Sequence, residues 1–339
     1  MRRSVFVTML KSEQSKVFFL MVLFVASQRI SSATLCDRYL RDEFRIDGKV
    51  MIVTGGTSGL GLETARNLAG RGGRIYIASR DEKKGNDSVK DIRKTTGNQD
   101  VHFIKVDLAS LKSIQRFSEI FHAKENRLDV LINNAGIGTG TYQKTEDGFE
   151  MDIAVNHLGP FLLTNLLLDL LKASAPSRIL VVTSIGYLFG DIPRTNLISE
   201  RFYPGFLFTY LNSKLANVLF ARELSKRLLK TGVTANSVDP GFSMSAFARH
   251  LPYGYRIIAE TIQQLFADRP EDACKTHVMV AVDPSLSTVT GKHFEDCVEE
   301  PLATSASKND TTSRWLWEAS AKLTKLDQYL MKQSTVRKQ

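Results

Sequence analysis

Short apolar runs alternate with longer amphipathic segments from about position 49 onward. Val50 to Val53 form an apolar run that ends in a glycine-rich turn, which is typical of a buried strand. Residues 60–71 then place apolar side chains at helical spacing, and Gly72-Gly73 ends that helix. The same alternation predicts strands at 50–53, 74–78, 102–106, 128–132, 178–182, 233–238 and 292–294, and helices at 60–71, up to about 96, 110–123, 153–172, 209–230 and 270–282, with a last helix around 315–329.

Strands that alternate with helices predict a parallel sheet with right-handed crossovers. The fold class is therefore α/β, a single Rossmann-type doubly wound parallel sheet flanked by helices. In such folds, ligands bind beyond the carboxyl ends of the strands. The candidate site residues that directly follow a strand are Gly55, Asp107, Asn133, Ser184 and Pro240. The topology and the candidate chemistry thus indicate the same edge of the sheet.

A glycine-rich segment, Thr54-Gly55-Gly56-Thr57-Ser58-Gly59-Leu60-Gly61, follows the first strand. A pyrophosphate must approach backbone N–H groups at a helix N-terminus, where a Cβ would block it. A plain strand-to-helix turn is the alternative, and the position after the first strand favours cofactor binding. The expected cofactor contacts are Gly55, Thr57, Ser58, Gly59, Leu60 and Gly61.

The end of the second strand bears on which dinucleotide binds. An acidic side chain there accepts hydrogen bonds from the ribose of NAD(H), whereas an arginine can pair with the 2′-phosphate of NADP(H). The strand ends Ala78-Ser79-Arg80, and Asp81 follows. A surface Arg80 paired with Asp81 is the alternative. Because Ser79 leaves no carboxylate to repel phosphate, the sequence favours NADP(H) with Arg80 as a contact.

Two further strand ends offer cofactor contacts. Asp107 could accept from the adenine amino group or cap the next helix, and the sequence favours neither role. In the segment 133–136, small residues would let a sugar or base lie against the backbone, while Asn133 could tie neighbouring strands together. A purely structural role for this segment stays open. The expected contacts are Asp107, Leu108, Asn134, Ala135 and Gly136.

Tyr210 and Lys214 form the central candidate pair, because residues at i and i+4 share a helix face. We expect the Lys214 ammonium to lower the pKa of Tyr210 and make it an acid or base near neutral pH. Roughly one Tyr-x-x-x-Lys is expected by chance in a chain this long, yet only Tyr210 of the 9 tyrosines has lysine four places on. Ser184 would hold the substrate oxygen against Tyr210, with a simple turn role as its alternative.

These segments together resemble the short-chain dehydrogenase/reductase family, over about residues 48–294. The resemblance implies a catalytic tetrad of Asn156, Ser184, Tyr210 and Lys214. It implies that Asn156 holds a water for proton relay and that Lys214 also binds the nicotinamide ribose. It further implies that Tyr210 exchanges a proton with the substrate oxygen while hydride moves between the substrate carbon and nicotinamide C4. The turn at 239–241 matches the family's nicotinamide-side loop, and its expected contacts are Pro240 and Gly241.

Within the family, the chain is similar to the retinol dehydrogenase-like branch over residues 147–150, 156–164 and 213–217. That branch implies NADP(H), membrane association and retinoid or other lipophilic alcohols and aldehydes. Residues 233–241 also resemble relatives that act on polyprenol-type lipids. Gly56-Thr57-Ser58 departs from the branch, which more often has Ala-Asn-Thr there.

Residues 241–268 are too apolar for an ordinary loop. We expect a mobile lid over an apolar substrate pocket, with a dimer contact or a membrane-resting segment as alternatives. The apolar residues are Phe247, Leu251, Tyr253, Tyr255, Ile257, Ile258 and Leu265. Helices 153–172 and 209–230 also carry wide apolar faces, and in relatives this pair forms a dimer interface, so a homodimer is expected.

The first 33 residues lie outside the predicted fold. Residues 17–26 are an apolar run that is too short to cross a bilayer comfortably. The run and its basic leader match a signal peptide, with small residues at 31–33 for cleavage, and a short uncleaved anchor is the alternative. We expect the endoplasmic reticulum membrane or the secretory pathway, and an extracellular protein if residues 1–33 are cleaved.

Composition excludes other classes of protein. The net charge is +9, but lysine and arginine are spread along the chain, so no nucleic-acid partner is expected. Cys36, Cys274 and Cys297 are an odd, widely spaced set that suggests neither a disulfide framework nor a zinc site. The 6 histidines include no H-x-x-x-H pair, so no structural metal is expected.

The sequence therefore predicts a domain at 45–330, a lid at about 241–268 and a basic tail at 331–339. The expected function is an NADP(H)-dependent oxidoreductase that interconverts a lipophilic alcohol, retinoid-like or polyprenol-like, and its aldehyde or ketone. Tyr210 would be the acid or base. The alternative is a cofactor-sensing binding protein with the same fold and little turnover, which need not keep all four tetrad residues.

Overall fold

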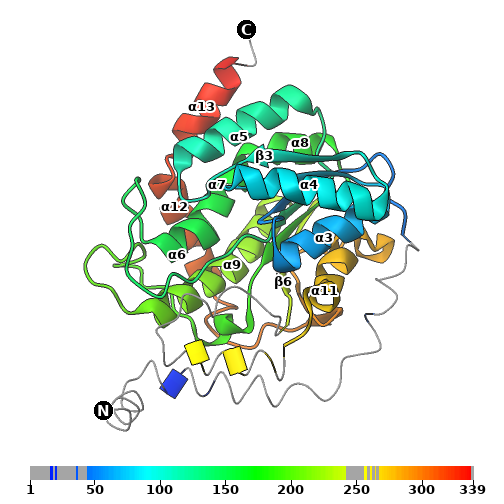
Figure 1. Ribbon diagram of the computed structural model, residues 1–339. Helices are drawn as coiled ribbons and strands as arrows, with labels where there is room; N and C mark the ends of the chain where they lie inside the picture. The colour runs from blue at the N-terminus through cyan, green and yellow to red at the C-terminus, as the bar shows by residue number, and fades with distance from the viewer. Residues whose placement is uncertain are drawn as a thin grey trace.

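One sheet of eight strands forms the centre of the structure (Figure 1). The computed structural model describes residues 16, 17, 20, 36, 44–241, 256, 257, 260, 261, 264 and 267–336. The strands are β1 (Val50–Thr54), β2 (Arg74–Ser79), β3 (Val101–Lys105), β4 (Val130–Asn133), β5 (Ser177–Val182), β6 (Val233–Asp239), β7 (His293–Glu295) and β8 (Val298–Glu300). They lie in the order β3-β2-β1-β4-β5-β6-β7-β8. All neighbouring strands are parallel except β7 and β8.

Alternate residues of the central strands enter two separate apolar cores. Val50 and Ile52 belong to one core, whereas Met51 and Val53 belong to the other. Helices α3 (Gly59–Gly70), α4 (Glu82–Thr96) and α11 (Pro270–Val282) cover the Met51 side. Helices α5 (Leu111–Lys124), α7 (Gly159–Leu166) and α9 (Phe206–Arg227) cover the Val50 side. The predicted doubly wound α/β fold is therefore confirmed, with an added antiparallel edge that the sequence did not predict.

The helix predicted at 153–172 is interrupted in the structure. It consists of α6 (Met151–Ile153), the π-helix η2 (Ala154–Leu158), α7 and α8 (Leu168–Ala173). The Gly159 N–H donates to the Ala154 carbonyl, five residues back, as a π-helix requires. Pro160 has no N–H to continue the regular ladder, which explains why the α-helical pattern breaks here.

The edge hairpin of β7 and β8 was only half predicted. Its two turn residues, Asp296 and Cys297, have φ of 46° and 60°, which suits a two-residue hairpin turn. Cys297 forms a disulfide with Cys36, and their Cα atoms are 5.5 Å apart. The sequence, which suggested no disulfide framework, did not reveal this bond, because sequence spacing carries no information on which distant residues meet. Cys274 is free and buried.

Two helices follow the hairpin where the sequence predicted one. They are α12 (Asp310–Leu323), which packs against α9, and α13 (Leu326–Val336), which runs past position 331, where the basic tail was expected to begin (Figure 1). Short 3-10 helices lie at η3 (Ile185–Phe189) and η5 (Pro284–Leu286). Among the described residues, no helix is both long enough and apolar enough to cross a bilayer. Most of the expected leader (1–33) and lid (241–268) lies outside the described residues.

Candidate active site

The glycine-rich turn between β1 and α3 has no room for side chains. A Cβ on Gly61 would lie 2.4 Å from Asn134 Nδ2 and 2.5 Å from the Gly55 carbonyl oxygen. Gly55 and Gly59 have φ of +69° and +52°, a region that residues with a Cβ rarely adopt. A Cβ on Gly59 would contact nothing within 4 Å, so the space outside this turn is open. Three glycines are thus required by the backbone and by close packing.

The N-terminus of α3 is suited to an anion. Its N-cap residue, Ser58, makes no side-chain capping bond, and its first turn contains no acidic residue. By contrast, Asp81 caps α4 and Ser110 caps α5. The first-turn N–H groups of α3 therefore remain available, and a phosphate is their natural partner. The residues of this turn fit the pyrophosphate of a dinucleotide.

Arg80 lies exposed at the carboxyl end of β2. Asp81 does not pair with it, because the Asp81 carboxylate accepts from the Lys84 N–H and lies 3.8 Å from the Lys84 ammonium. No ion pair of Arg80 is recorded among the residues that the structure describes. The Ser79 hydroxyl is buried and has no hydrogen-bond partner there. The described contacts thus oppose the alternative in which Arg80 is occupied by Asp81.

Asp107 shapes the turn after β3 and does not cap α5. Its Oδ1 accepts from the Ala109 N–H at 3.0 Å, whereas the capping residue of α5 is Ser110. The helix-cap alternative for Asp107 was therefore wrong. Leu108 is buried, and a Cβ on Gly159 would lie 2.5 Å from its carbonyl oxygen. This contact fixes the turn against the start of α7.

The segment after β4 is held by hydrogen bonds to β1. Asn134 Nδ2 donates to the Thr54 carbonyl at 2.8 Å, and the Asn134 and Ala135 N–H groups donate to Thr54 Oγ1. Asn134 thus ties the neighbouring strands, and not Asn133 as expected. Asn133 instead donates to Thr164 Oγ1 on α7 at 2.9 Å. The Asn134 side-chain amide is therefore already engaged with β1. The expected contact between Asn134 and the cofactor remains a prediction.

Helix α9 brings Tyr210 and Lys214 to the end of β5, where Ser184 lies. The side chains of Tyr210 and Ser184 lie close together beside Gly186, and their interaction acts on the pKa of the tyrosine. A Cβ on Gly186 would lie 3.6 Å from Tyr210 Cε1 and 3.7 Å from Ser184 Oγ, so a glycine is needed between them. Ser184 also caps η3 by accepting from the Gly186 N–H. Its turn role and its contact with Tyr210 therefore coexist.

Burial, and not the neighbouring ammonium, dominates the pKa of Tyr210. Desolvation raises the pKa of Tyr210 to about 12, and the interaction with Ser184 acts in the opposite direction. The Lys214 Nζ lies 5.5 Å from the centre of the Tyr210 ring. Burial also lowers the pKa of Lys214 to about 8. The expectation that Lys214 lowers the tyrosine pKa was wrong, because loss of water outweighs the charge at this distance.

Asn156 lies inside the π-helix, and its side chain makes three hydrogen bonds. Its Nδ2 donates to the Ile137 carbonyl at 2.8 Å and to Ser213 Oγ at 2.9 Å. Its Oδ1 accepts from the Ile137 N–H at 2.7 Å. Asn156 therefore fastens the segment after β4 to α9. Only the second lone pair of Oδ1 is left for a water, so the expected relay role remains a prediction.

Gly136 and the 239–241 turn complete the predicted set. Gly136 is exposed, and a Cβ there would lie 3.1 Å from Lys214 Nζ. Gly241 has φ of +70°, and its N–H donates to Asp239 Oδ1 at 3.0 Å, which closes the turn around Pro240. The predicted residues from the ends of six strands, β1 to β6, thus lie along one edge of the sheet.

Two buried carboxyl groups near Lys214 were missed by the sequence reasoning. Asp152 accepts from the Thr139 N–H at 3.0 Å and from Thr209 Oγ1 at 3.2 Å, and burial raises its pKa to about 6. Asp239 was considered only as part of a turn, yet it is 1% exposed and interacts electrostatically with Lys214. The sequence did contain a signal for the buried Asp152 carboxyl, because Asp152 stands between the apolar residues Met151 and Ile153.

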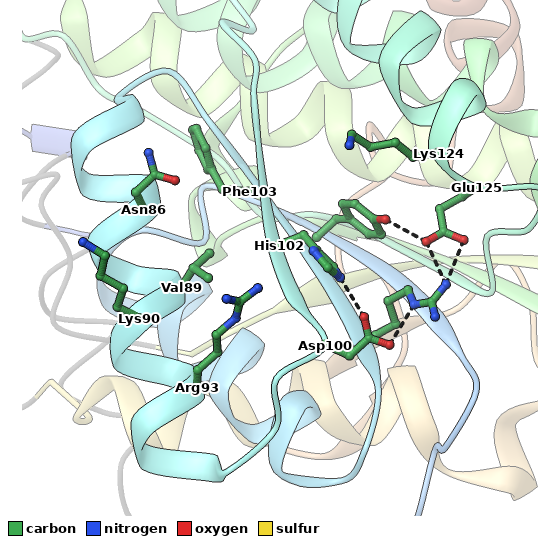
Figure 2. A pocket seen from close by; sticks show the side chains of 11 residues that line it. Asn86, Val89, Lys90, Arg93, Asp100, His102, Phe103, Lys124 and Glu125 are labelled. Carbon is green, nitrogen blue, oxygen red and sulfur yellow. Dashed lines mark hydrogen bonds and ion pairs between the residues drawn. The ribbon is translucent and has the colours of Figure 1, made fainter.

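A hollow of about 710 Å³ lies elsewhere, at the outer edge of the sheet beside β3 and α4 (Figure 2). Arg74 bonds there to Asp100 and Glu125, and the Tyr76 hydroxyl donates to Glu125 at 2.7 Å. None of the predicted site residues lines it. Arg74 pairs with Asp100 and Glu125, so we interpret this network as a fastening of the two outer strands.

Comparisons with known proteins agree with this geometry. Residues 49–253 match the family model described as short chain dehydrogenase. Retinol dehydrogenase 11 of Homo sapiens is 46% identical over 279 residues, which covers 82% of this chain and 86% of that protein. Retinol dehydrogenase 13 of Homo sapiens is 43% identical over 286 residues, with 83% and 86% covered.

Solved structures share the fold. An uncharacterized protein from Mycobacterium Paratuberculosis has a TM-score of 0.68 at 29% identity, covering 87% of this chain and 98% of that one. The Pseudomonas aeruginosa RhlG/NADP active-site complex has a TM-score of 0.61 at 24% identity, with 75% and 96% covered. At that identity the second likeness concerns the fold alone.

Proposed function

Because the chain belongs to the short-chain dehydrogenase family of alcohol/carbonyl oxidoreductases, we propose that it interconverts a lipophilic alcohol and its aldehyde or ketone with NADP(H). One observation carries the proposal. The Tyr210 side chain lies beside Ser184, and the Lys214 ammonium lies one helical turn away. This group lies at the same sheet edge as the uncapped N-terminus of α3.

The proposed proton transfer runs through Tyr210. The dinucleotide, when bound, supplies or accepts the hydride. In carbonyl reduction, Ser184 holds the substrate oxygen, and the Tyr210 hydroxyl gives its proton to that oxygen. The proton leaves a phenolate behind, and the nearby Lys214 ammonium stabilises that charge. In alcohol oxidation the same proton returns to Tyr210. Asn156 acts here by holding the segment after β4 in place.

The preference for NADP(H) rests on the end of β2. Arg80 is exposed there, and the Asp81 carboxylate is engaged at the N-terminus of α4. A guanidinium can therefore meet a 2′-phosphate without a competing carboxylate at the strand end. The remaining proposed cofactor contacts lie after β1, β3, β4 and β6 and on α9. They are Gly55, Thr57, Ser58, Gly59, Leu60, Gly61, Asp107, Leu108, Asn134, Ala135, Gly136, Tyr210, Lys214, Pro240 and Gly241.

The lipophilic substrate class is supported by the apolar surroundings of Tyr210. Phe206, Leu207 and Leu211 form a buried cluster on α9, and Tyr210 packs against it. Val17, from the N-terminal apolar run, also packs against this cluster. The retinol dehydrogenases named above suggest a retinoid-like substrate, and a polyprenol-like substrate has the same character. Membrane association, a homodimer, a lid at 241–268 and a location in the endoplasmic reticulum or secretory pathway belong to the same proposal.

The test is turnover by the purified protein. Retinal, a polyprenal, a steroid ketone and a small aldehyde are each offered with NADPH and, in parallel, with NADH. We expect the highest kcat/KM for a lipophilic carbonyl with NADPH. A far higher kcat/KM with NADH would overturn the cofactor assignment, and a clear preference for the small aldehyde would overturn the substrate class.

Tyr210→Phe separates an enzyme from a cofactor-sensing protein. We expect it to abolish turnover and to retain cofactor binding, measured by the fluorescence of bound NADPH, because the phenol hydroxyl is lost and the ring remains. If the variant keeps the biological activity of the natural chain, the sensing alternative is favoured instead.

A further inference from the structure

Three potential metal ligands meet where β6 pairs with β7. In the parallel register, Ser237 lies opposite His293 and Asp239 lies opposite Glu295. Because side chains two residues apart point to the same face of a strand, all four lie on one face. One ligand atom each from Asp239, His293 and Glu295 lies within 4.8 Å of the others.

Two polar atoms of this cluster are buried and have no hydrogen-bond partner among the described residues. Asp239 is 1% exposed and His293 is 2% exposed. Asp239 Oδ1 accepts from the Gly241 N–H, but Asp239 Oδ2 and His293 Nε2 have no partner in the part of the chain that the structure describes. A buried polar atom without a partner is destabilising by about 1–3 kcal/mol, so two in one cluster call for a ligand.

The histidine is oriented as a metal ligand should be. His293 Nδ1 lies 3.0 Å from Ser237 Oγ, and Ser237 Oγ donates to the Lys292 carbonyl. With the serine proton on the Lys292 carbonyl, Nδ1 carries the hydrogen and donates it to the serine oxygen. Nε2 is then the ring nitrogen with a free lone pair, and it is buried. Metal-bound histidines are usually held by such a second hydrogen bond.

We propose that Asp239, His293 and Glu295 bind a divalent transition-metal ion of the zinc or manganese class. One imidazole nitrogen and two carboxylates are suitable ligands for these ions, and the imidazole disfavours magnesium and calcium. Two carboxylates balance a charge of 2+, so the occupied cluster is neutral. A fourth ligand position remains for a water, since Glu295 is only partly buried.

The protonation states agree with this geometry. Burial lowers the pKa of His293 to about 4, so the ring is neutral at pH 7. Burial and the neighbouring Glu295 raise the pKa of Asp239 well above its usual value, and burial raises that of Glu295 to about 7. The repulsion between the buried Asp239 carboxyl and the partly buried Glu295 carboxyl would be relieved by a cation between them.

The site would be structural and close to the reaction. Asp239 precedes the Pro240-Gly241 turn, and Glu295 lies in the edge hairpin that also contains Cys297. A bound ion would therefore clamp the expected nicotinamide-side loop to the edge of the sheet. The inference departs from the sequence expectation of no structural metal. That expectation considered only histidines at helical spacing, whereas these ligands come from two paired strands.

The test is metal binding by the full chain, purified without a histidine tag and stripped with a chelator. ZnCl₂ and MnCl₂ are titrated by calorimetry, and metal content is measured by mass spectrometry after dialysis. His293→Ala removes one ligand, and His102→Ala is the matched control, because His102 lies on β3 at the other edge of the sheet. We expect one ion per chain in the unaltered protein and in His102→Ala. We expect at least tenfold weaker binding in His293→Ala.

Glu295→Gln keeps the test decisive if His293→Ala does not fold, because Glu295 is only partly buried. It should show the same weakening, and zinc should raise the unfolding temperature of the unaltered protein but not of this variant. The proposal is overturned if the unaltered chain retains no ion and shows no binding heat, which would mean that a shared proton or water satisfies the cluster. It is also overturned if His293→Ala or Glu295→Gln binds as tightly as the control.

Discussion

Removing the Lys214 ammonium should stabilise the folded protein and abolish turnover. Lys214 is 4% exposed on α9, and burial lowers its pKa from 10.5 to about 8. Its ammonium has no recorded hydrogen bond to the described part of the chain. The nearby carboxyls of Asp152 and Asp239 have raised pKa values themselves, so they compensate the charge only in part. Lys214→Met removes the charge and keeps most of the side-chain volume.

The magnitude follows from the difference in pKa between the folded and unfolded chain. The folded value of about 8 lies below the unfolded value of 10.5, so the unfolded chain binds the proton more tightly. Below pH 8 the lysine is charged in both states, and the folded state is destabilised by about 3 kcal/mol, at about 1.4 kcal/mol per pH unit. This penalty shrinks as the pH rises from 8 to 10.5 and vanishes above it.

Urea unfolding followed by circular dichroism at pH 7, 9 and 10.5 measures this effect. At pH 7, Lys214→Met should have a free energy of unfolding about 2–3 kcal/mol above that of the unaltered protein, and the gap should close by pH 10.5. Lys90→Met, an exposed lysine on α4, is the control and should change stability by less than about 0.5 kcal/mol. Turnover of Lys214→Met should fall about 100-fold or more. A variant that is less stable at pH 7, or a gap that is constant with pH, would refute the reasoning.

Three further outcomes are expected. Gly61→Ala places a Cβ 2.4 Å from Asn134 Nδ2, and such overpacking is destabilising by about 1–3 kcal/mol. The Kd for NADPH in a fluorescence titration should therefore rise about tenfold. An unchanged Kd would contradict the proposed binding of the pyrophosphate by the glycine-rich turn. Arg80→Ala should lower kcat/KM with NADPH about 10- to 100-fold by loss of a charge-assisted contact and leave NADH within about twofold; equal losses with both cofactors would rule out the 2′-phosphate contact. Cys297→Ser removes the disulfide with Cys36 and should lower the free energy of unfolding by about 2–4 kcal/mol. Reduction of the unaltered protein with dithiothreitol should have the same effect. The prediction is contradicted if Cys297→Ser and the unaltered protein have the same urea midpoint in the absence of dithiothreitol.

Strands β1 to β6 could be predicted because each is a short, largely apolar run followed by a helix. The interruption of the helix predicted at 153–172 was missed, although Pro160 within that run was an available signal. Strand β8 was also missed. Its residues Val298, Glu299 and Glu300 are all exposed, so no alternation of apolar and polar positions marks it.

The meeting of Tyr210, Ser184 and Lys214 could be predicted, because helical spacing and strand order both determine position. The direction of the tyrosine pKa could not, because sequence spacing gives the proximity of a charge but not the loss of water around it. The same limit applies to Asn134. Its bond to Thr54 depends on how β1 and β4 pair, which only the folded sheet defines.

Burial shifts the pKa values of both Tyr210 and Lys214, and both shifts favour the proposed proton transfer. It raises the pKa of Tyr210 to about 12 and lowers that of Lys214 to about 8. At neutral pH the tyrosine is therefore protonated, as carbonyl reduction requires at its start, while Lys214 is still charged and can stabilise the phenolate that forms. A surface lysine would be less costly to the fold, but water would weaken its interaction with that phenolate. The destabilisation expected from Lys214 is thus the physical counterpart of its role beside Tyr210.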